Sequence, residues 1–564
     1  MSGCRGFAAG SADREVFSLA GDQNGTSLSD KTLLKITFLF LLPFAVAFGQ
    51  GSRVDGDARV GFESIRAKDL REYLTYLASD ELQGRETSYA GERSAAEYIA
   101  DHFHALGLKP IGDDGSYLQH YDIDLARVSD SSTIVVNTKR GSETFSWIKD
   151  FISYGGRDTS VSGQVMLVGY GDSRGPESDR AALAGKIIMT FAGSRKGVQD
   201  TVRAQVMRRF FSAARRDSGS LATLIVVNDS GPASYEQIAA QFGGSGVIRG
   251  RMSLKGETPR GGRPGQLSFY ISPAVARAIL APSGLSLNAL REKAARDSLF
   301  TPLPLGDVSV SVNCRMLREQ RQAENVVGLL EGSDPVMKND VVIFSAHFDH
   351  LGVGPTGAIY HGADDNGSGT AMVMDLARAF VENPVRPKCS LLFLTVSGEE
   401  KGLLGSAYYT SHPIIPLART IADFNTDMIG RMDTAHEKGK DSVYTYLIGS
   451  DKISTELDSI IQLANRESNN IECDYHYNDE HDPEQYYRRS DHYNFAKNGV
   501  PIVFFFTGVH ADYHRPTDTV DKIMFDRVVK IGQLVYYAGW KTANVGRMLV
   551  KNGTGAGYRN SQAP

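Results

Sequence analysis

The stretch VVIFSAHFDH (341–350) decides the fold, because it predicts a buried strand that ends in ionisable side chains. The strand is apolar except for Ser345, and then His347, Asp349 and His350 come in close succession. Burying such groups costs several kcal/mol unless each is paired or bound to a metal ion. The strand therefore ends either at a solvated loop or at a functional site, and the rest of the sequence has to distinguish the two.

The composition is that of a globular protein with more than one domain. At 564 residues the chain is too long for one ordinary hydrophobic core. It is 41% hydrophobic and 23% charged with a net charge of -5, so it lacks the basic excess of a nucleic-acid-binding protein. Its four cysteines include no CxxC spacing, which argues against a disulfide framework and against a thiolate zinc site. We expect two domains with appended segments and no nucleic-acid partner.

The segment KTLLKITFLFLLPFAVAFGQG (31–51) has the pattern of a secretory signal peptide. Two lysines precede an apolar run that is shorter than the roughly 20 residues needed to span a bilayer, and small residues come after it. We expect residues 1–50 to form a leader, with the signal peptide at about 31–49. The protein is then secreted, periplasmic or displayed at the cell surface. A retained anchor is the alternative, and without it we expect no stable membrane partner.

The pattern of apolar and polar residues changes along the chain. Short apolar runs between glycines fill the region 145–305, which shows no cluster of His, Asp and Glu at ligand-like spacing. From 325 to 545, apolar strands alternate with amphipathic helices, which predicts an α/β fold with a mostly parallel sheet covered on both faces. The predicted divisions after the leader are the first part of the α/β domain (52–144), a β-rich insert (145–305), the main α/β domain (306–548) and a disordered tail (549–564).

Ionisable side chains come directly after several of the predicted strands. In parallel sheets, functional groups gather beyond the carboxyl ends of the strands. A single Asp at such a position is usually a helix cap, and a lone His is usually hydrogen-bonded, but four strands that deliver such groups to one edge favour a metal site. The candidates are His347, Asp364, Asp365, Glu399, Glu400, Asp427 and His514.

The types of these side chains indicate zinc. Imidazole and carboxylate groups without thiolates suit zinc, and two His with three carboxylates can hold two zinc ions that share one carboxylate. Two metals about 3.5–4 Å apart can act on both sides of a hydrolytic displacement. A further carboxylate is needed to accept a proton from water, and the adjacent pair Glu399 and Glu400 offers both a ligand and a base.

Six motifs in a fixed order resemble the co-catalytic zinc aminopeptidase and glutamate carboxypeptidase family. The similarity covers about 60–120 and 320–545, and the insert is similar to a protease-associated domain through its glycine-bounded strands and the segment LAGKIIM. The resemblance implies the zinc-exopeptidase fold, a mixed and mostly parallel sheet sandwiched by helices. The motifs are AHFDH, GADDNGSG, SGEEKGLLGS, FNTDMIG, RRSDHYNFAKNGVP and DYHRPTDT.

The resemblance also implies a ligand set for two zinc ions per chain. Asp365 is the expected bridging ligand, and Asp364 beside it is expected not to bind metal. In relatives a cis peptide bond occurs in this loop, and we expect it between Asp364 and Asp365. The remaining expected ligands are His347, Glu400, Asp427 and His514.

The other implied roles concern catalysis. Glu399 is expected to be the general base and Tyr513 to polarise the substrate carbonyl. The carboxylate of Asp349 is expected to hydrogen-bond the far nitrogen of His347 and fix its tautomer. Arg489 is expected to lie near the substrate.

Other ionisable groups are given structural interpretations. We expect His350 and His361 to be solvated loop residues. The segment ECDYHYNDEHDPEQYY (472–487) is dense in His and acidic groups, and we expect a polar rim loop there rather than an additional metal site.

The resulting functional hypothesis is a secreted zinc aminopeptidase that removes N-terminal residues from peptides with water activated by two zinc ions. A carboxypeptidase or dipeptidase is the alternative, because Arg488 and Arg489 are available to hold a terminal carboxylate. A receptor-like binding protein that keeps the fold without catalysis is disfavoured, since all five ligand positions and the base carry suitable residues.

Overall fold

The computed structural model describes residues 54–553 with several gaps. The expected leader (1–50) lies outside the described residues, as does most of the expected tail. The part of the tail that is described, 549–553, is held in place, since Leu549 is buried and the side chain of Asn552 donates to the carbonyl of Asp451. The expected disorder of the tail stays a prediction. The gaps are 154–155, 171–182, 194–218, 230–233, 245–249, 258–266, 297–299, 355–356 and 438–442.

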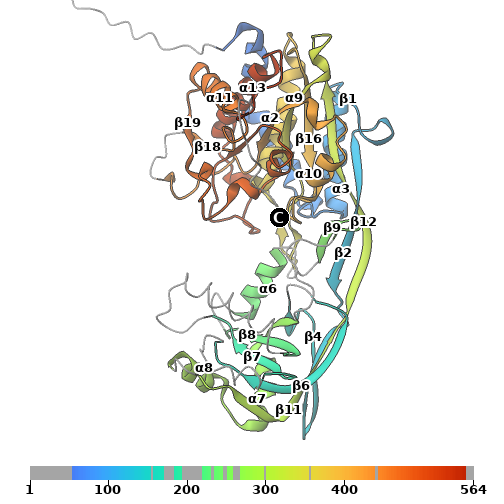
Figure 1. Cartoon of the computed structure of the whole chain (residues 1–564), viewed down its shortest axis with the longest axis vertical. Coiled ribbons are helices and arrows are strands. Elements are labelled where there is room, and N and C mark those ends of the chain that lie inside the picture. Colours follow the sequence, from blue (N-terminus) through green and yellow to red (C-terminus); the bar gives the residue numbers. More distant parts are fainter. Residues whose placement is uncertain are drawn as a thin grey trace, which may run out of the picture. The chain divides into compact units, whose positions relative to one another are not determined.

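A ten-stranded mixed sheet carries the α/β domain (Figure 1). Its centre is parallel, in the order β20-β17-β13-β16. These four strands are fully buried, as the apolar runs of β13, β16 and β20 predict for strands covered on both faces, while β17 also buries the polar Asp423 and Asn425. The full order is β19-β18-β20-β17-β13-β16-β12-β2-β9, with β1 also paired to β12. The bounds are β1 Lys109–Pro110, β2 Leu118–Val128, β9 Arg251–Leu254, β12 Met316–Leu330, β13 Val341–His347, β16 Ser390–Val396, β17 Thr420–Thr426, β18 Tyr444–Ile448, β19 Glu472–Asp474 and β20 Ile502–Phe506.

Helices cover the two faces of this sheet, and alternate residues of β13 contact the two layers. Val342 and Phe344 belong to the large core formed with most of the helices, while Val341 and Ile343 pack with α10 and α12. α13 lies very close to β13, because a Cβ atom at Gly539 would lie 2.3 Å from the ring of Phe344. The first layer contains α1 Arg59–Ser64, α2 Ala67–Leu77, α3 Ala90–Ala105, α9 Gly369–Glu382, α11 Thr455–Glu467 and α13 Phe525–Ala543; the second contains α10 Leu404–Ser411 and α12 His492–Ala496.

A second sheet of eight strands has its own hydrophobic core. It also contains four parallel neighbours, β6-β7-β8-β10. β3 lies wholly outside the predicted bounds of 145–305 and β4 and β11 lie partly outside them, and the assignment as a protease-associated domain stays a prediction. The order is β4-β3-β11-β6-β7-β8-β10-β5, with β3 Thr133–Thr138, β4 Gly141–Ser146, β5 Phe151–Ile152, β6 Thr159–Leu167, β7 Ile187–Phe191, β8 Ala222–Val226, β10 Ser268–Ile271, β11 Leu303–Cys314, α6 Tyr235–Gly244, α7 Pro273–Leu280 and α8 Leu287–Arg296.

The chain passes between the two sheets through neighbouring strands. It leaves the first sheet at the end of β2 and re-enters it at the start of β12, where Val128 and Met316 are direct antiparallel partners. β9, which lies between these points in the sequence, pairs with β2 at the edge of the first sheet. None of the helices in the described part of the chain has both the length and the apolar character that a membrane span requires.

Candidate metal centre

The ionisable groups predicted at the strand ends lie together at one edge of the ten-stranded sheet. His347 ends β13, the pair Glu399 and Glu400 comes after β16, and Asp427 comes after β17. Since β13 pairs in parallel with both β16 and β17, their carboxyl ends meet at the same edge. The loop after β20 adds His514, and the loop before α9 adds Asp365.

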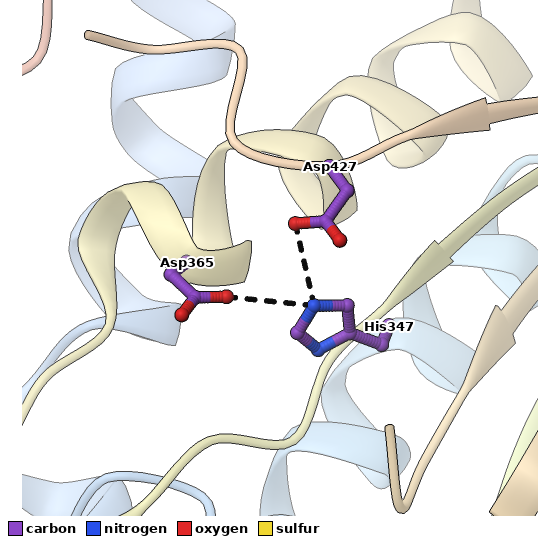
Figure 2. A group of neighbouring side chains, drawn as sticks. All are labelled: His347, Asp365 and Asp427. Atoms are coloured by element: carbon purple, nitrogen blue, oxygen red, sulfur yellow. Dashed lines mark ion pairs between the residues drawn. The ribbon is translucent and has the colours of Figure 1, made fainter. Parts of the chain in front are cut away.

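A first group of metal-binding atoms comes from His347, Asp365 and Asp427. The Nε2 atom of His347 lies 3.5 Å from Oδ1 of Asp365 and 3.4 Å from Oδ1 of Asp427. Figure 2 shows both carboxylates turned toward the imidazole. All three residues are buried, so their ligand atoms converge on a space that one cation can occupy.

A second group lies on the other side of Asp365. The Nε2 atom of His514 is 3.1 Å from Oδ2 of Asp365 and 3.3 Å from Oε2 of Glu400. Asp365 thus presents one carboxylate oxygen to His347 and the other to His514. This is the arrangement of a carboxylate that bridges two sites.

His350 also belongs to this region, contrary to the expectation of a solvated loop residue. Its side chain is fully buried, with Nδ1 2.8 Å from Oε1 of Glu400 and 3.9 Å from Oδ2 of Asp365. Together these three residues form a further group that could hold a metal ion. His361 remains near the surface, where its Nε2 lies 2.8 Å from Oδ1 of Asp80.

The donor atoms fit metal binding rather than a network of hydrogen bonds. Buried polar atoms without a hydrogen-bond partner destabilise a folded protein unless another interaction replaces the missing one. Imidazole nitrogens and carboxylate oxygens without thiolates are ligands that suit zinc. Several buried atoms that face the two sites lack such a partner, namely His347 Nε2, Asp365 Oδ2 and Asp427 Oδ1.

Comparison with known proteins identifies this region. Residues 325–539 match Peptidase family M28. This region, here called the M28 domain, is similar to that family over less than half of the chain. The resemblance to co-catalytic zinc aminopeptidases is thereby confirmed.

Two relatives illustrate the similarity in sequence to the M28 domain. Aminopeptidase YwaD of Bacillus subtilis (strain 168) is 27% identical over 227 residues, which are 38% of this chain and 43% of that protein. Leucine aminopeptidase 2 of Arthroderma otae is 28% identical over 246 residues, which are 39% of this chain and 44% of that protein. The chain therefore matches less than half of the length of these two relatives.

Solved structures confirm the fold. An aminopeptidase from Aneurinibacillus sp. strain AM-1 superposes with a TM-score of 0.52 and 19% identity, covering 87% of this chain and 97% of that one. A zinc aminopeptidase from Bacillus subtilis gives a TM-score of 0.52 and 18% identity, covering 85% of this chain and 95% of that one. The predicted α/β zinc-exopeptidase fold is correct.

The tautomer of His347 in the M28 domain is set mainly by a backbone group. Its Nδ1 atom is 3.2 Å from the carbonyl oxygen of Asp349 and 3.6 Å from Oδ1 of the same residue. An Nδ1–H that donates to the carbonyl leaves Nε2 free for a metal. The expected hydrogen bond from the ring to the carboxylate is thus replaced by one to the carbonyl. The carboxylate instead accepts hydrogen bonds from Thr87 Oγ1 (2.7 Å) and from the backbone N–H of Glu399 (3.1 Å).

Glu399 lies beside both donor groups. It lines the same pocket as Asp365 and Asp427. Its removal from water raises the pKa of the Glu399 carboxyl; His347 opposes this rise, and the neighbouring Glu400 adds to it. A carboxylate with a raised pKa is suited to accepting and returning a proton near neutral pH.

Tyr513 and Arg489 border the same pocket, as expected for residues near a substrate. The ring of Tyr513 stacks on His514 with centroids 3.8 Å apart. The guanidinium of Arg489 lies 4.7 Å from the ring centre of Tyr486 and 3.6 Å from Oε2 of Glu484. The walls are largely apolar and are formed by Met428, Tyr486, Phe504, Phe506 and Val509.

The loop that carries Asp365 differs in one detail from the expectation. Asp364 is outside the donor groups, as expected, since its Oδ1 accepts the N–H of Gly430 and its Oδ2 faces His510 Nε2 at 3.2 Å. The cis peptide bond, however, joins Asp365 to Asn366 and not Asp364 to Asp365. The N–H groups of Asp364 and Asp365 both donate to Oδ2 of Asp518, and the cis bond comes directly after them.

Sequence reasoning also missed Ser490, whose hydroxyl donates to Oδ2 of Asp427 at 2.7 Å. Its place in the motif RRSD next to Arg489 was the available signal. Among the described residues, the acidic and His-rich segment 472–487 contributes to neither donor group.

Proposed function

We propose that this chain is a secreted aminopeptidase that uses two zinc ions per chain to hydrolyse N-terminal residues from peptides. The observation that supports this best is the position of Asp365, whose two carboxylate oxygens face two separate His residues. The aminopeptidase names of its relatives add to it, and so does the signal-peptide pattern at 31–51.

The proposed ligands divide into two sets around Asp365. His347 and Asp427 complete one set, and His514 and Glu400 complete the other. When bound there, zinc supplies a Lewis acid that polarises a carbonyl and makes water more acidic. His350, which lies 2.8 Å from Glu400, orients that carboxylate.

Glu399 is the proposed general base. It takes a proton from the water that attacks the peptide carbonyl carbon. The carbon–nitrogen bond then breaks, and Glu399 returns the proton to the leaving amine. Both transfers use the raised pKa of its carboxyl group. Tyr513 borders the same pocket and is proposed to donate to the substrate carbonyl oxygen.

The pocket favours a free amine over a free carboxylate. Of the three acidic residues that line it, Asp365 and Asp427 are proposed zinc ligands, and Glu399 is left to attract a positively charged amino terminus. Arg489, one of the two cations on which the alternative carboxypeptidase hypothesis rests, is already close to Glu484 and to the ring of Tyr486. The apolar walls are suited to a large apolar side chain on the terminal residue.

A panel of peptides with free or blocked ends tests the proposal. We expect cleavage that requires a free amino terminus, is lost on chelation and returns with zinc. Cleavage that tolerates a blocked amine but needs a free carboxylate would replace the aminopeptidase with the carboxypeptidase. Sequencing the amino terminus of the exported protein tests the leader, with a mature start near Gly49 expected.

A further inference from the structure

A short segment far from the M28 match contacts the metal centre. Residues Arg85, Glu86 and Thr87, here called the bracing segment, precede α3 and lie well before residue 325, where the family match begins. The backbone runs beside the loop after β13, since the carbonyl of Arg85 accepts the N–H of His350 at 3.0 Å. The carbonyl of Gly84 likewise accepts the N–H of Gly352 at 3.0 Å.

The side chain of Arg85 joins two loops that carry ligands. It is 0% exposed, and its guanidinium donates to the carbonyls of Phe348 at 2.7 Å, His361 at 2.8 Å and Gly362 at 2.9 Å. A fourth bond reaches Leu77. Phe348 is the residue after His347, and Gly362 begins the turn that leads to Asp365. The planar guanidinium therefore fixes the separation between these two loops.

The charge of Arg85 is also matched to the centre. Burial lowers the pKa of its guanidinium, while the negative charges of Asp349, Asp518, Asp365 and Glu400 raise it. These carboxylates surround the proposed metal sites. Arg85 thus holds the loops with hydrogen bonds while partly offsetting the repulsion among the carboxylates.

Glu86 reaches a third loop. Its Oε1 lies 3.1 Å from Nζ of Lys401, and the two side chains are only 1% and 4% exposed. Lys401 is the residue after Glu400. Removing one partner of a buried ion pair leaves an uncompensated buried charge, so this contact is a firm constraint on the Glu400 loop.

Thr87 completes the set. Its hydroxyl donates to Oδ2 of Asp349 at 2.7 Å, and Oδ1 of the same carboxylate accepts the N–H of Glu399. Three consecutive side chains thus reach three loops, and these loops carry His347, Asp365 and the pair of glutamates.

We propose that the bracing segment positions the metal ligands and Glu399, so that Arg85, Glu86 and Thr87 are positioning residues of the active site. The proposal rests on the proposed di-zinc function. Removal of an outer partner of a metal ligand typically lowers metal affinity about 10- to 100-fold, and we expect a loss of this size for each residue.

The first test compares Thr87→Val with Thr87→Ser in the full chain. Valine keeps the shape of threonine but removes the hydroxyl that Asp349 accepts, whereas serine keeps it. We expect Thr87→Val to lower zinc affinity at least about tenfold, measured by competition with a chromophoric chelator, and to change the absorption spectrum of bound Co²⁺. Thr87→Ser should keep the wild-type zinc affinity and the wild-type Co²⁺ spectrum.

A matched control separates positioning from general stability. Thr542 is also fully buried, and its hydroxyl donates to the carbonyl of Ala538 within α13. Thr542→Val should lower the melting temperature without altering zinc affinity or the Co²⁺ spectrum. Equal effects of Thr87→Val and Thr542→Val on zinc affinity would overturn the proposal.

The second test is Arg85→Lys, which keeps the charge but loses the planar set of donors. Zinc affinity should fall about 10- to 100-fold. Arg378→Lys is the control, because Arg378 is a mostly buried arginine that joins α9 to the carbonyl of Ser64. If Arg85→Lys does not fold, the comparison of Thr87→Val with Thr87→Ser is the deciding test.

Wild-type protein that binds no zinc would overturn the proposed function together with this inference. Wild-type protein that binds two zinc ions no more tightly than the variants would overturn the inference alone.

Discussion

The two sheets contain the same kind of parallel centre but differ in the side chains at the carboxyl ends of their strands. At the ends of β13, β16 and β17 lie His347, Glu399 with Glu400, and Asp427. In the second sheet, the described residues directly after β6, β7 and β8 include one acidic group, Asp229. Asp229 forms ion pairs with Arg277 and Arg291. A parallel sheet thus offers an edge where side chains can meet, and the residues placed there decide whether it becomes a reactive site.

The strongest test of this comparison changes one acid at each edge. Asp365→Asn removes the carboxylate shared by both donor groups. Zinc affinity and peptidase activity should therefore both fall by more than about 100-fold, the upper end of the loss expected when only a neighbour of a ligand is removed. Asp229→Asn should leave activity unchanged and cost about 1 kcal/mol or less, because its ion pairs are partly exposed. Zinc analysis and kcat/KM measure the first effect and thermal unfolding the second. Comparable loss of activity in the two variants would contradict the contrast.

The next effect separates the two neighbouring glutamates. Glu399→Gln should retain zinc while kcat/KM falls by about 10²- to 10⁴-fold, because the proton acceptor is lost but no ligand is. Glu400→Gln should lose metal, since Glu400 lies 3.3 Å from His514. A Glu399→Gln variant that still turned over peptides at the wild-type rate would exclude Glu399 as the base.

A smaller effect concerns the apolar pocket. Val509 is a partly buried residue of its wall, and Val509→Phe should fill space that a terminal side chain would occupy. We expect kcat/KM to fall about tenfold for peptides with an N-terminal Leu and to change little for those with an N-terminal Ala. An equal loss for both peptides would mean that this pocket does not hold the terminal side chain.

The last effect is on stability and depends on pH. β17 contains the buried Asp423, whereas β7 and β8 contain no charged residue. Burial raises the pKa of Asp423 to about 8, with Ser345 opposing the rise. The folded protein therefore keeps a proton that the unfolded chain releases above its ordinary pKa of about 3.9, and the free energy of unfolding falls as pH rises from about 4 to 8, by at most about 1.4 kcal/mol per pH unit.

Asp423→Asn should remove this contribution. Relative to the wild type, the unfolding free energy of the variant should rise from pH 5 to pH 8 and then stay constant. Denaturant titration at each pH measures this difference. Asp229→Asn, at an exposed acid shortly after β8, is the reference variant. The same pH dependence of the unfolding free energy in the two variants would mean that Asp423 has an ordinary pKa.

The sequence predicted the features that depend on local pattern. Apolar runs identified most of the central strands, and the rule for strand ends brought His347, Glu400 and Asp427 to one edge. The fold beyond these strands was inferred from the resemblance. The role of each ligand and of Glu399 stays a prediction.

Features that depend on distant contacts were not predicted. The buried position of His350 requires the carbonyl of Arg85, a residue more than 250 positions away in the sequence. The described tail residues 549–553 contact Asp451 and Glu456, also far away in sequence. The contacts of the bracing segment were not predicted either, since its partners lie on loops that come together only in the folded chain. The alternating pattern of one strand or helix contains none of this information.

The junction between the two sheets bears on how such a chain could arise. Val128 and Met316 are paired neighbours, so everything between them occupies the place of a hairpin turn. A segment inserted there can be gained or lost in one genetic step without shifting the register of β2 and β12. β9 complicates the reverse step, because it covers the outer edge of β2. Loss of the whole insert would expose that edge to pairing with other chains, so an ancestor without the insert needed another way to protect it.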